Sequence, residues 1–370
     1  MKLGARTLKT GIGVVIAMIV GNLIPYISTM QPAWIVIMGL QRTVRKSWET
    51  LFSRAIAAFM GGLTALIMYS AFGNSPIVVG FTIIIFIMMM NALNLRDVIG
   101  LASITVVIIM LTPTENITML VSTAFWRVME NIIGVLIAFF VNLLILPSHY
   151  DRTLYEAINK TSSEVLIRLR AILRKNGEYG SYNSDLEWTK SQIAHIEELF
   201  QLSSEELVWL PKKVIARKRK LVVLRSFISV LQEMTKLLYL IHIHSNTLFD
   251  LDDSLRMAIR ERIETLSAAN EQIFLKFDGR ISPNQVNFFN PTKGRRQQLM
   301  ETLFEEAKIE GAMDASKLEH SNSLILIAGA IISVENELIH LNTLVRAYHT
   351  YHSDIDSGDS LDSLSHDNQH

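Results

Sequence analysis

Residues 76–93 read PIVVGFTIIIFIMMMNAL, an apolar run without a charged side chain. As a helix this run is nearly as long as the hydrocarbon layer of a bilayer is thick, which takes about 20 residues to cross. A helix that is apolar on every face has no side to turn towards water. The segment therefore predicts a membrane-spanning helix.

Five more apolar segments lie within the first 150 residues. The full set is Leu8–Ile24, Tyr26–Leu40, Ala55–Phe72, Pro76–Leu93, Val98–Leu111 and a last segment ending at Leu146. The last segment is uncharged from Asn131, and it starts as early as Val121 if Arg127 and Glu130 lie near the membrane surface. The segment Tyr26–Leu40 is short for a full crossing and can be either a short span or a broken, re-entrant one.

Charge divides the chain into two unlike halves. Residues 1–147 carry nine Lys/Arg and four Asp/Glu, whereas residues 148–370 carry 26 and 31. The first half has too few charges for a soluble surface, and the second is charged like an ordinary soluble protein. We predict a transmembrane domain at 1–149, a cytoplasmic helical domain at 150–352 and a disordered Ser/Asp-rich tail at 353–370. The fold class is all-α: about six transmembrane helices followed by a cytoplasmic helical bundle.

The basic residues of the first half predict its orientation. Eight of the nine lie before the first segment (Lys9 counted among these), between the second and third, and between the fourth and fifth, while the alternate loops contain no Lys or Arg. Positive loops stay in the cytoplasm. Six crossings therefore place both termini in the cytoplasm of a cell-membrane protein. The basic residues assigned to the membrane surface between the second and third segments are Arg42, Arg45, Lys46 and Arg54.

Polar groups at membrane depth are the candidates for a transport pathway. Arg127 and Glu130 are three residues apart, so they share a helix face and can pair. They can bind a substrate carboxylate or a proton, or they can be an interfacial anchor pair. Gly134 and Asn142 lie on the same helix in a row of small residues, which either lines the pathway or only packs helices together.

One Arg–Gly spacing occurs twice in the membrane half. Arg54 is followed seven residues later by Gly61, and Arg127 is followed seven residues later by Gly134. A duplicated unit of three crossings would place two such units in inverted topology, as in many transporters. On one shared spacing alone, we favour coincidence.

The second half reads as long amphipathic helices without strand signals, and the sequence offers no chemistry for an enzyme. The chain has no Cys, no phosphate-binding glycine loop and no hydrolase or zinc-protease motif, so we expect no catalytic residues and no cofactor. His242 and His244 are two apart on a helix and face different directions, so no metal site is expected. The net negative charge of this half argues against nucleic acid.

Three stretches carry a resemblance to a known family. They are MKLGARTLKTGIGVVIA at 1–17, QPAWIVIMGLQRTVRKSWETLFSRAIAAFMGGLTAL at 31–66 and RVMENIIGVLIAFFVNLLILP at 127–147. They resemble the aromatic acid exporter family, within the wider fusaric-acid-resistance-like membrane proteins. The helical remainder is similar to the C-terminal cytoplasmic domain of the Gram-positive branch.

The resemblance implies export of aromatic carboxylic acids, driven by an ion gradient. The expected partners are the lipid bilayer and a small organic acid substrate. We also expect a homo-oligomer, because six short helices enclose little space. A second interpretation stays open, in which the chain is a non-transporting membrane scaffold or sensor whose helical domain binds a cytoplasmic partner.

Overall fold

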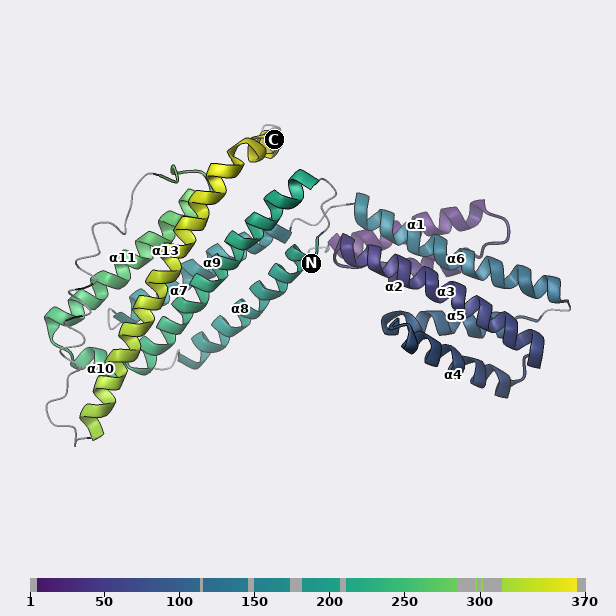
Figure 1. Ribbon diagram of the computed structural model, residues 1–370, viewed down its shortest axis with the longest axis horizontal. Coiled ribbons are helices and arrows are strands. Elements are labelled where there is room, and N and C mark those ends of the chain that lie inside the picture. The colour runs from purple at the N-terminus through teal and green to yellow at the C-terminus, as the bar shows by residue number, and fades with distance from the viewer. Residues whose placement is uncertain are drawn as a thin grey trace. The chain divides into compact units, whose positions relative to one another are not determined.

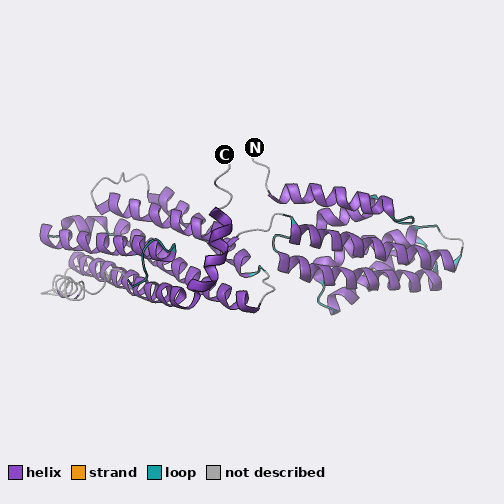
Figure 2. Ribbon diagram, turned by 90° about the horizontal axis from the view of Figure 1, so that it is seen from above, coloured by secondary structure: helices purple, strands orange, loops and turns teal. Residues whose placement is uncertain are grey.

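The computed structural model describes residues 5–113, 116–145, 150–173, 182–206, 211–284 and 315–364, together with positions 297 and 301. Every regular element in these residues is a helix, and none is a strand (Figure 2). The all-α prediction is therefore confirmed for the described residues. The chain divides into two compact units: unit 1 is made of Met1–His149 with Glu205–Leu207, and unit 2 is made of the rest of the chain.

The described residues of unit 1 form six α-helices and one 3-10 turn (Figure 1). The helices are α1 (Ala5–Leu23), α2 (Met30–Gly39), α3 (Val44–Phe72), α4 (Pro76–Ala92), α5 (Ile99–Leu111) and α6 (Ile117–Leu144), with the turn η1 (Arg96–Val98) before α5. Each predicted apolar segment is a helix. Two are longer than expected at their amino ends: α3 starts before Arg54, and α6 includes Arg127 and Glu130 within its length.

Within the part of the chain that the structure describes, four helices are long and apolar enough to cross a membrane by length and composition. They are Arg6–Leu23, Val44–Phe72, Ile117–Leu144 and Asn322–Thr350, and Met30–Gly39 and Pro76–Ala92 are shorter apolar helices. With ten residues, α2 covers about 15 Å, or half the hydrocarbon layer. The second apolar segment, which was predicted to be short for a full crossing, therefore forms a half-length helix.

The six helices of unit 1 form two matching triplets, α1–α3 and α4–α6. Each triplet has a first helix of 19 or 17 residues, a short helix of 10 or 13 and a long helix of 29 or 28. The connection between the first and second helix holds a non-glycine residue at positive φ in both: Tyr26 at 87° and Asn94 at 57°. The long helices start at Val44 and Ile117, and the same offset of 73 residues relates Arg54 to Arg127 and Gly61 to Gly134.

The packing of the triplets is also matched. The long helices α3 and α6 lie side by side at the centre (Figure 1), α2 packs on α6 as α5 packs on α3, and α1 packs on α6 as α4 packs on α3. The two long helices run antiparallel, because Trp48 near the start of α3 meets Phe139 late in α6 (ring centroids 5.4 Å apart), while Gly62 later in α3 faces Val128 early in α6. Matching helices that run in opposite directions define an inverted repeat. The interpretation of the repeated Arg–Gly spacing as coincidence is therefore wrong. A single spacing carries far less information than helix lengths, turns and packing partners together.

Unit 2 is a bundle of long amphipathic helices around one apolar core. Its helices are α7 (Tyr150–Leu173), α8 (Tyr182–Ser204), α9 (Pro211–Ile243), α10 (Ser245–Asp250), α11 (Asp253–Phe277) and α13 (Ala315–Leu364). Helix α9 packs against α7, α8 and α13. The structure continues α13 to Leu364, into the segment 353–370 for which the composition predicts disorder; residues 365–370 lie outside the described ones.

Helix α13 is apolar enough to be a membrane span by composition, but its packing is that of a core helix. Its apolar face lies against α9 and α11, and Leu324, Ile331 and Leu338 belong to the core of unit 2. Glu335 forms an ion pair with Arg262 of α11 at 2.5 Å, and both side chains are 5% exposed. A buried pair of this kind binds α13 to α11 within the bundle.

Candidate functional site

The pair predicted from sequence, Arg127 and Glu130, forms in the first half of α6. Arg127 Nη1 lies 2.8 Å from Glu130 Oε2, and the side chains are 26% and 2% exposed. A carboxylate this deeply buried is costly unless its oxygens accept hydrogen bonds. The remaining partners of Glu130 therefore decide what this pair does.

Those partners come from the amino end of α2. The backbone N–H of Ser28, just before α2, donates to Glu130 Oε1 at 2.6 Å. In the amide orientation that satisfies both neighbours, Gln31 donates to Glu130 Oε2 at 2.7 Å and accepts from Arg127 Nη1 at 3.3 Å. The amino end of a helix carries partial positive charge, so Glu130 is bound there by backbone, amide and guanidinium together.

The opposite end of α2 is held by a cation. Arg54 of α3 donates from Nη2 to the carbonyl of Met38 at 2.7 Å and from Nη1 to that of Ile35 at 3.5 Å. These are carbonyls of the last turns of α2, which carry partial negative charge. The free backbone groups at both ends of the half-length helix thus have hydrogen-bond partners. Partners of this kind allow interrupted helices at membrane depth.

The four basic residues assigned to the membrane surface are in different surroundings. Arg42 and Lys46 are exposed, and Arg45 forms an exposed pair with Glu49 at 3.0 Å. Arg54 differs from them, because it is partly buried and bound to the carbonyl groups of α2. The assignment of the group to the membrane surface stays a prediction.

Asn142 belongs to a second polar cluster near the carboxyl end of α6. Its Nδ2 donates to the carbonyl of Thr43 at 3.2 Å and to Ser47 Oγ at 2.8 Å, and its Oδ1 accepts from Lys9 Nζ at 3.0 Å. Lys9 is only 5% exposed. Twelve residues of helix place this cluster about 18 Å from Glu130, so the structure does not bring Asn142 and the Arg127–Glu130 pair together.

Gly134 lies one turn beyond Glu130, where α2 crosses α6. A Cβ atom at this position would lie 2.7 Å from Ile35 Cβ and 3.1 Å from the carbonyl oxygen of Pro32. The missing side chain therefore allows the close approach of two helices, as small residues do in membranes. This close approach brings the amino end of α2 to Glu130, so Gly134 supports the site through packing.

Sequence reasoning missed several members of these clusters. Ser28 donates a hydrogen bond from its backbone N–H, and no side-chain pattern in the sequence predicts such a contact. Lys9 was counted with the basic residues preceding the first segment, but the structure buries it inside α1. Asn131 donates to Thr105 Oγ1 of α5 at 3.1 Å, a partner that spacing along the chain cannot reveal. The deep position of such polar residues was the available signal.

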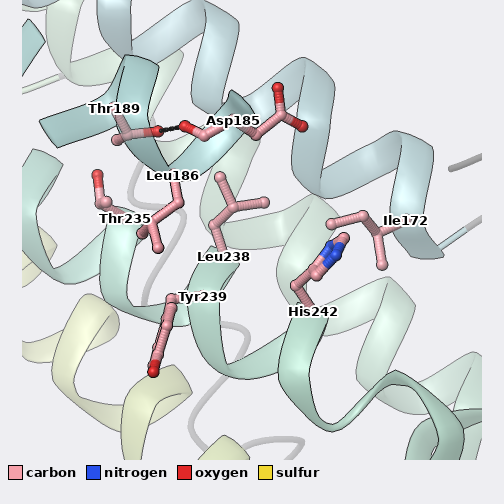
Figure 3. A pocket seen from close by; sticks show the side chains of 8 residues that line it. All are labelled: Ile172, Asp185, Leu186, Thr189, Thr235, Leu238, Tyr239 and His242. Carbon is pink, nitrogen blue, oxygen red and sulfur yellow. Dashed lines mark hydrogen bonds between the residues drawn. The ribbon is translucent and has the colours of Figure 1, made fainter. Parts of the chain in front are cut away.

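A small cavity in unit 2 lies between α7, α8 and α9 (Figure 3). Its volume is about 20 Å³, which is room for about one water molecule. It is lined by Asp185, Thr189 and His242 among others, and Thr189 Oγ1 donates to the carbonyl of Asp185 at 2.5 Å. Burial lowers the pKa of His242 below its usual value, and the charge of Asp185 partly opposes this. Among the described residues, no group of three or more His, Asp or Glu side chains can hold a metal ion.

The lowered pKa of His242 predicts a pH dependence of unit 2. Below about pH 6.5 the unfolded chain binds a proton at this residue more readily than the folded chain, so stability is complete above that pH and falls as the pH decreases. Because the side chain is partly exposed, the loss should be below about 1 kcal/mol, or about 1–2 °C in Tm. His242→Gln should remove this share of the Tm difference between pH 7.5 and 5.5. His195→Gln, at an exposed position, should leave the difference unchanged, and equal behaviour of the two variants would contradict the assignment.

An all-α unit with apolar helices in an inverted repeat defines a multi-pass membrane protein. Residues 1–145 match the family model described as aromatic acid exporter family member 1. The resemblance of the membrane half to the aromatic acid exporter family is therefore confirmed.

Relatives extend the similarity over both units. The chain is 27% identical over 352 residues to the UPF0421 protein YgaE of Bacillus subtilis, covering 95% of this chain and 97% of that protein. It is 26% identical over 254 residues to a UPF0421 protein of Staphylococcus saprophyticus, covering 58% of this chain and 75% of the relative. Neither name states an activity. The family concerned is one of transporters and not of enzymes.

Proposed function

We propose that this chain is a secondary exporter of small aromatic carboxylic acids in the cell membrane, with both termini in the cytoplasm. The observation that carries the proposal is the Arg127–Glu130 pair at the amino end of α2, inside an inverted repeat. Transporters with inverted repeats commonly bind anionic substrate groups at the amino end of an interrupted helix, and here the guanidinium of Arg127 lies at that end. The family match of residues 1–145 supports the aromatic substrate class.

The geometry suggests how a proton could be coupled to export. Glu130 occupies the positive end of α2 and the guanidinium of Arg127, the same groups that a substrate carboxylate would need. Protonation of Glu130 would free both for the substrate, and deprotonation would return them to Glu130. Binding of a proton and binding of the carboxylate would then be linked, so that the two leave the cell together.

The charged ends of α2 suggest which element moves. Arg54 holds the carboxyl end of α2, and Glu130 holds its amino end. In the matched position of the second repeat, α5 packs on α3 as α2 packs on α6. An exchange of conformations between the two triplets would open the site alternately to each side of the membrane. Many apolar side chains on the outer helix faces, including Phe59, Phe81 and Ile84, are exposed in the single chain and would contact lipid or a second copy in a homo-oligomer.

Transport is tested directly in inside-out vesicles that contain the full chain. Acidifying the medium outside the vesicles, on the cytoplasmic face of the membrane, should drive uptake of a radiolabelled aromatic carboxylate, and collapsing the proton gradient should stop it. A deletion strain screened against a panel of organic acids identifies the substrate. Vesicles that take up no acid from this panel, combined with recovery of one stoichiometric cytoplasmic partner, would support the scaffold interpretation instead.

The proposed orientation makes a separate prediction. Reporter fusions placed after Arg45 and after Pro147 should both show cytoplasmic activity, and a fusion at Asn74 should show the opposite location, because basic loops stay inside. The Asn74 fusion serves as the control for reporter function on the outer side. A cytoplasmic signal at Asn74 or an outside signal at Arg45 would contradict the six-crossing topology.

A further inference from the structure

A second, larger cavity, which is open to solvent, lies in unit 2 between α8, α9 and α13. Its volume is about 480 Å³, which is in the range of small-molecule binding sites. One part of its wall is apolar and consists of Phe200 of α8, Leu221 and Val222 of α9, and Leu344 of α13. An apolar wall of this kind suits a flat hydrophobic body.

The α9 side of the cavity carries hydrogen-bond donors. Arg225, Ser226 and Ser229 line it from one face of the helix. The guanidinium carbon of Arg225 lies 5.4 Å from the centroid of the Phe200 ring, which places a cation beside the apolar wall. The hydroxyl of Ser226 is buried and has no hydrogen-bond partner within the described part of the chain. A buried hydroxyl without a partner is unfavourable, and a ligand oxygen in the cavity would satisfy it.

The α13 side of the cavity limits the charge of a ligand. Glu337 and His340 are three residues apart, so they share a face of α13. The carboxylate of Glu337 would repel a second negative charge on the ligand, while it could accept a hydrogen bond from a hydroxyl group. The Arg225 cation, the Ser226 hydroxyl and the Glu337 carboxylate together favour a ligand with one negative charge.

We propose that this cavity binds a small monocarboxylate with a flat apolar body. The carboxylate pairs with Arg225 and accepts from Ser226, and the apolar body lies against Phe200 and Leu344. The site is built entirely within unit 2 and uses none of the residues assigned to export, so it holds whether or not unit 1 transports. It gives the helical domain a means to respond to a small organic acid.

Binding is measured by titration calorimetry on the full chain in detergent, with benzoate as the probe. The chain carries Arg127→Ala and Glu130→Gln, so that the membrane site cannot contribute. Benzoate should bind, while the uncharged benzamide and the dianion phthalate should each bind at least tenfold more weakly. Equal affinities for benzoate and benzamide would contradict recognition of the carboxylate. If the titration with benzoate gives no heat of binding, the proposed site is wrong.

Variants of the cavity locate the binding. Arg225→Ala removes an exposed side chain, and Ser226→Val fills the space at the buried hydroxyl; each should weaken benzoate binding at least tenfold. Lys218→Ala, an exposed residue of the same helix outside the cavity, should leave it unchanged. Because Arg225 is exposed, its replacement should not unfold the bundle, so unchanged benzoate affinity in this variant would overturn the proposal even if Ser226→Val fails to fold.

Discussion

Efflux should disappear when Arg127 is replaced by Ala, because this change removes the guanidinium proposed to bind the substrate carboxylate. It also leaves Glu130, which is 2% exposed, without its charged partner. Breaking a buried ion pair from one side typically costs about 3–5 kcal/mol. The single variant therefore loses both function and stability, and further variants must separate the two.

The double variant Arg127→Ala/Glu130→Gln makes that separation. It contains no uncompensated buried charge, because the Gln amide can still accept from the backbone N–H of Ser28. It should recover most of the lost stability, measured as Tm in detergent, but no transport. Efflux at the wild-type rate in the folded double variant would remove Arg127 from the mechanism.

Glu130→Gln alone tests the coupling. Arg127 loses its charged partner and stays available for the substrate carboxylate, so exchange of labelled for unlabelled acid across the vesicle membrane should continue. Accumulation driven by a pH gradient should be lost, since the group that carries the proton is gone. Arg152→Ala is the matched control, because its pair with Glu156 is exposed on both sides and contributes about 0–1 kcal/mol.

The second large effect is expected at Gly134. In Gly134→Ala the new methyl group would lie 2.7 Å from Ile35 Cβ and 3.1 Å from the Pro32 carbonyl oxygen. These atoms belong to or adjoin the backbone of α2, so α2 must move away from α6. We expect a loss of about 2 kcal/mol or more in stability, typical of overpacking, together with loss of transport because the amino end of α2 leaves Glu130.

Gly62 provides an informative comparison on α3. A methyl group there would lie 2.7 Å from Val128 Cγ2, which is the end of a side chain. Gly62→Ala should therefore be rescued by Val128→Ala, whereas Gly134→Ala should not be rescued by Ile35→Ala, because the Ile35 Cβ and the Pro32 carbonyl remain. Gly80→Ala is the control, since nothing lies within 4 Å of the added atom. A Gly134→Ala protein as stable as the Gly80→Ala protein would contradict the close approach.

Much of the membrane half was determined by the sequence itself. Lipid imposes a minimum length and apolarity on each crossing, and both are properties of consecutive residues, so the six apolar segments could be located without a structure. The pairing of Arg127 with Glu130 was predictable for a similar reason, since side chains three apart on a helix share a face. The amphipathic helices of the second half, and the absence of strands among its described residues, likewise follow from local periodicity.

Tertiary structure alone decided which distant groups meet. Nothing local to Ser28, Gln31 or Arg54 shows that α2 is held at both ends, because those contacts join α2 to α6 and α3 across long stretches of chain. The same holds for the separation of Asn142 from the charged pair, and for the match between the two triplets. Sequence periodicity reports which face of a helix is buried, but the partner on that face is set by packing, which depends on the shapes of all the helices at once.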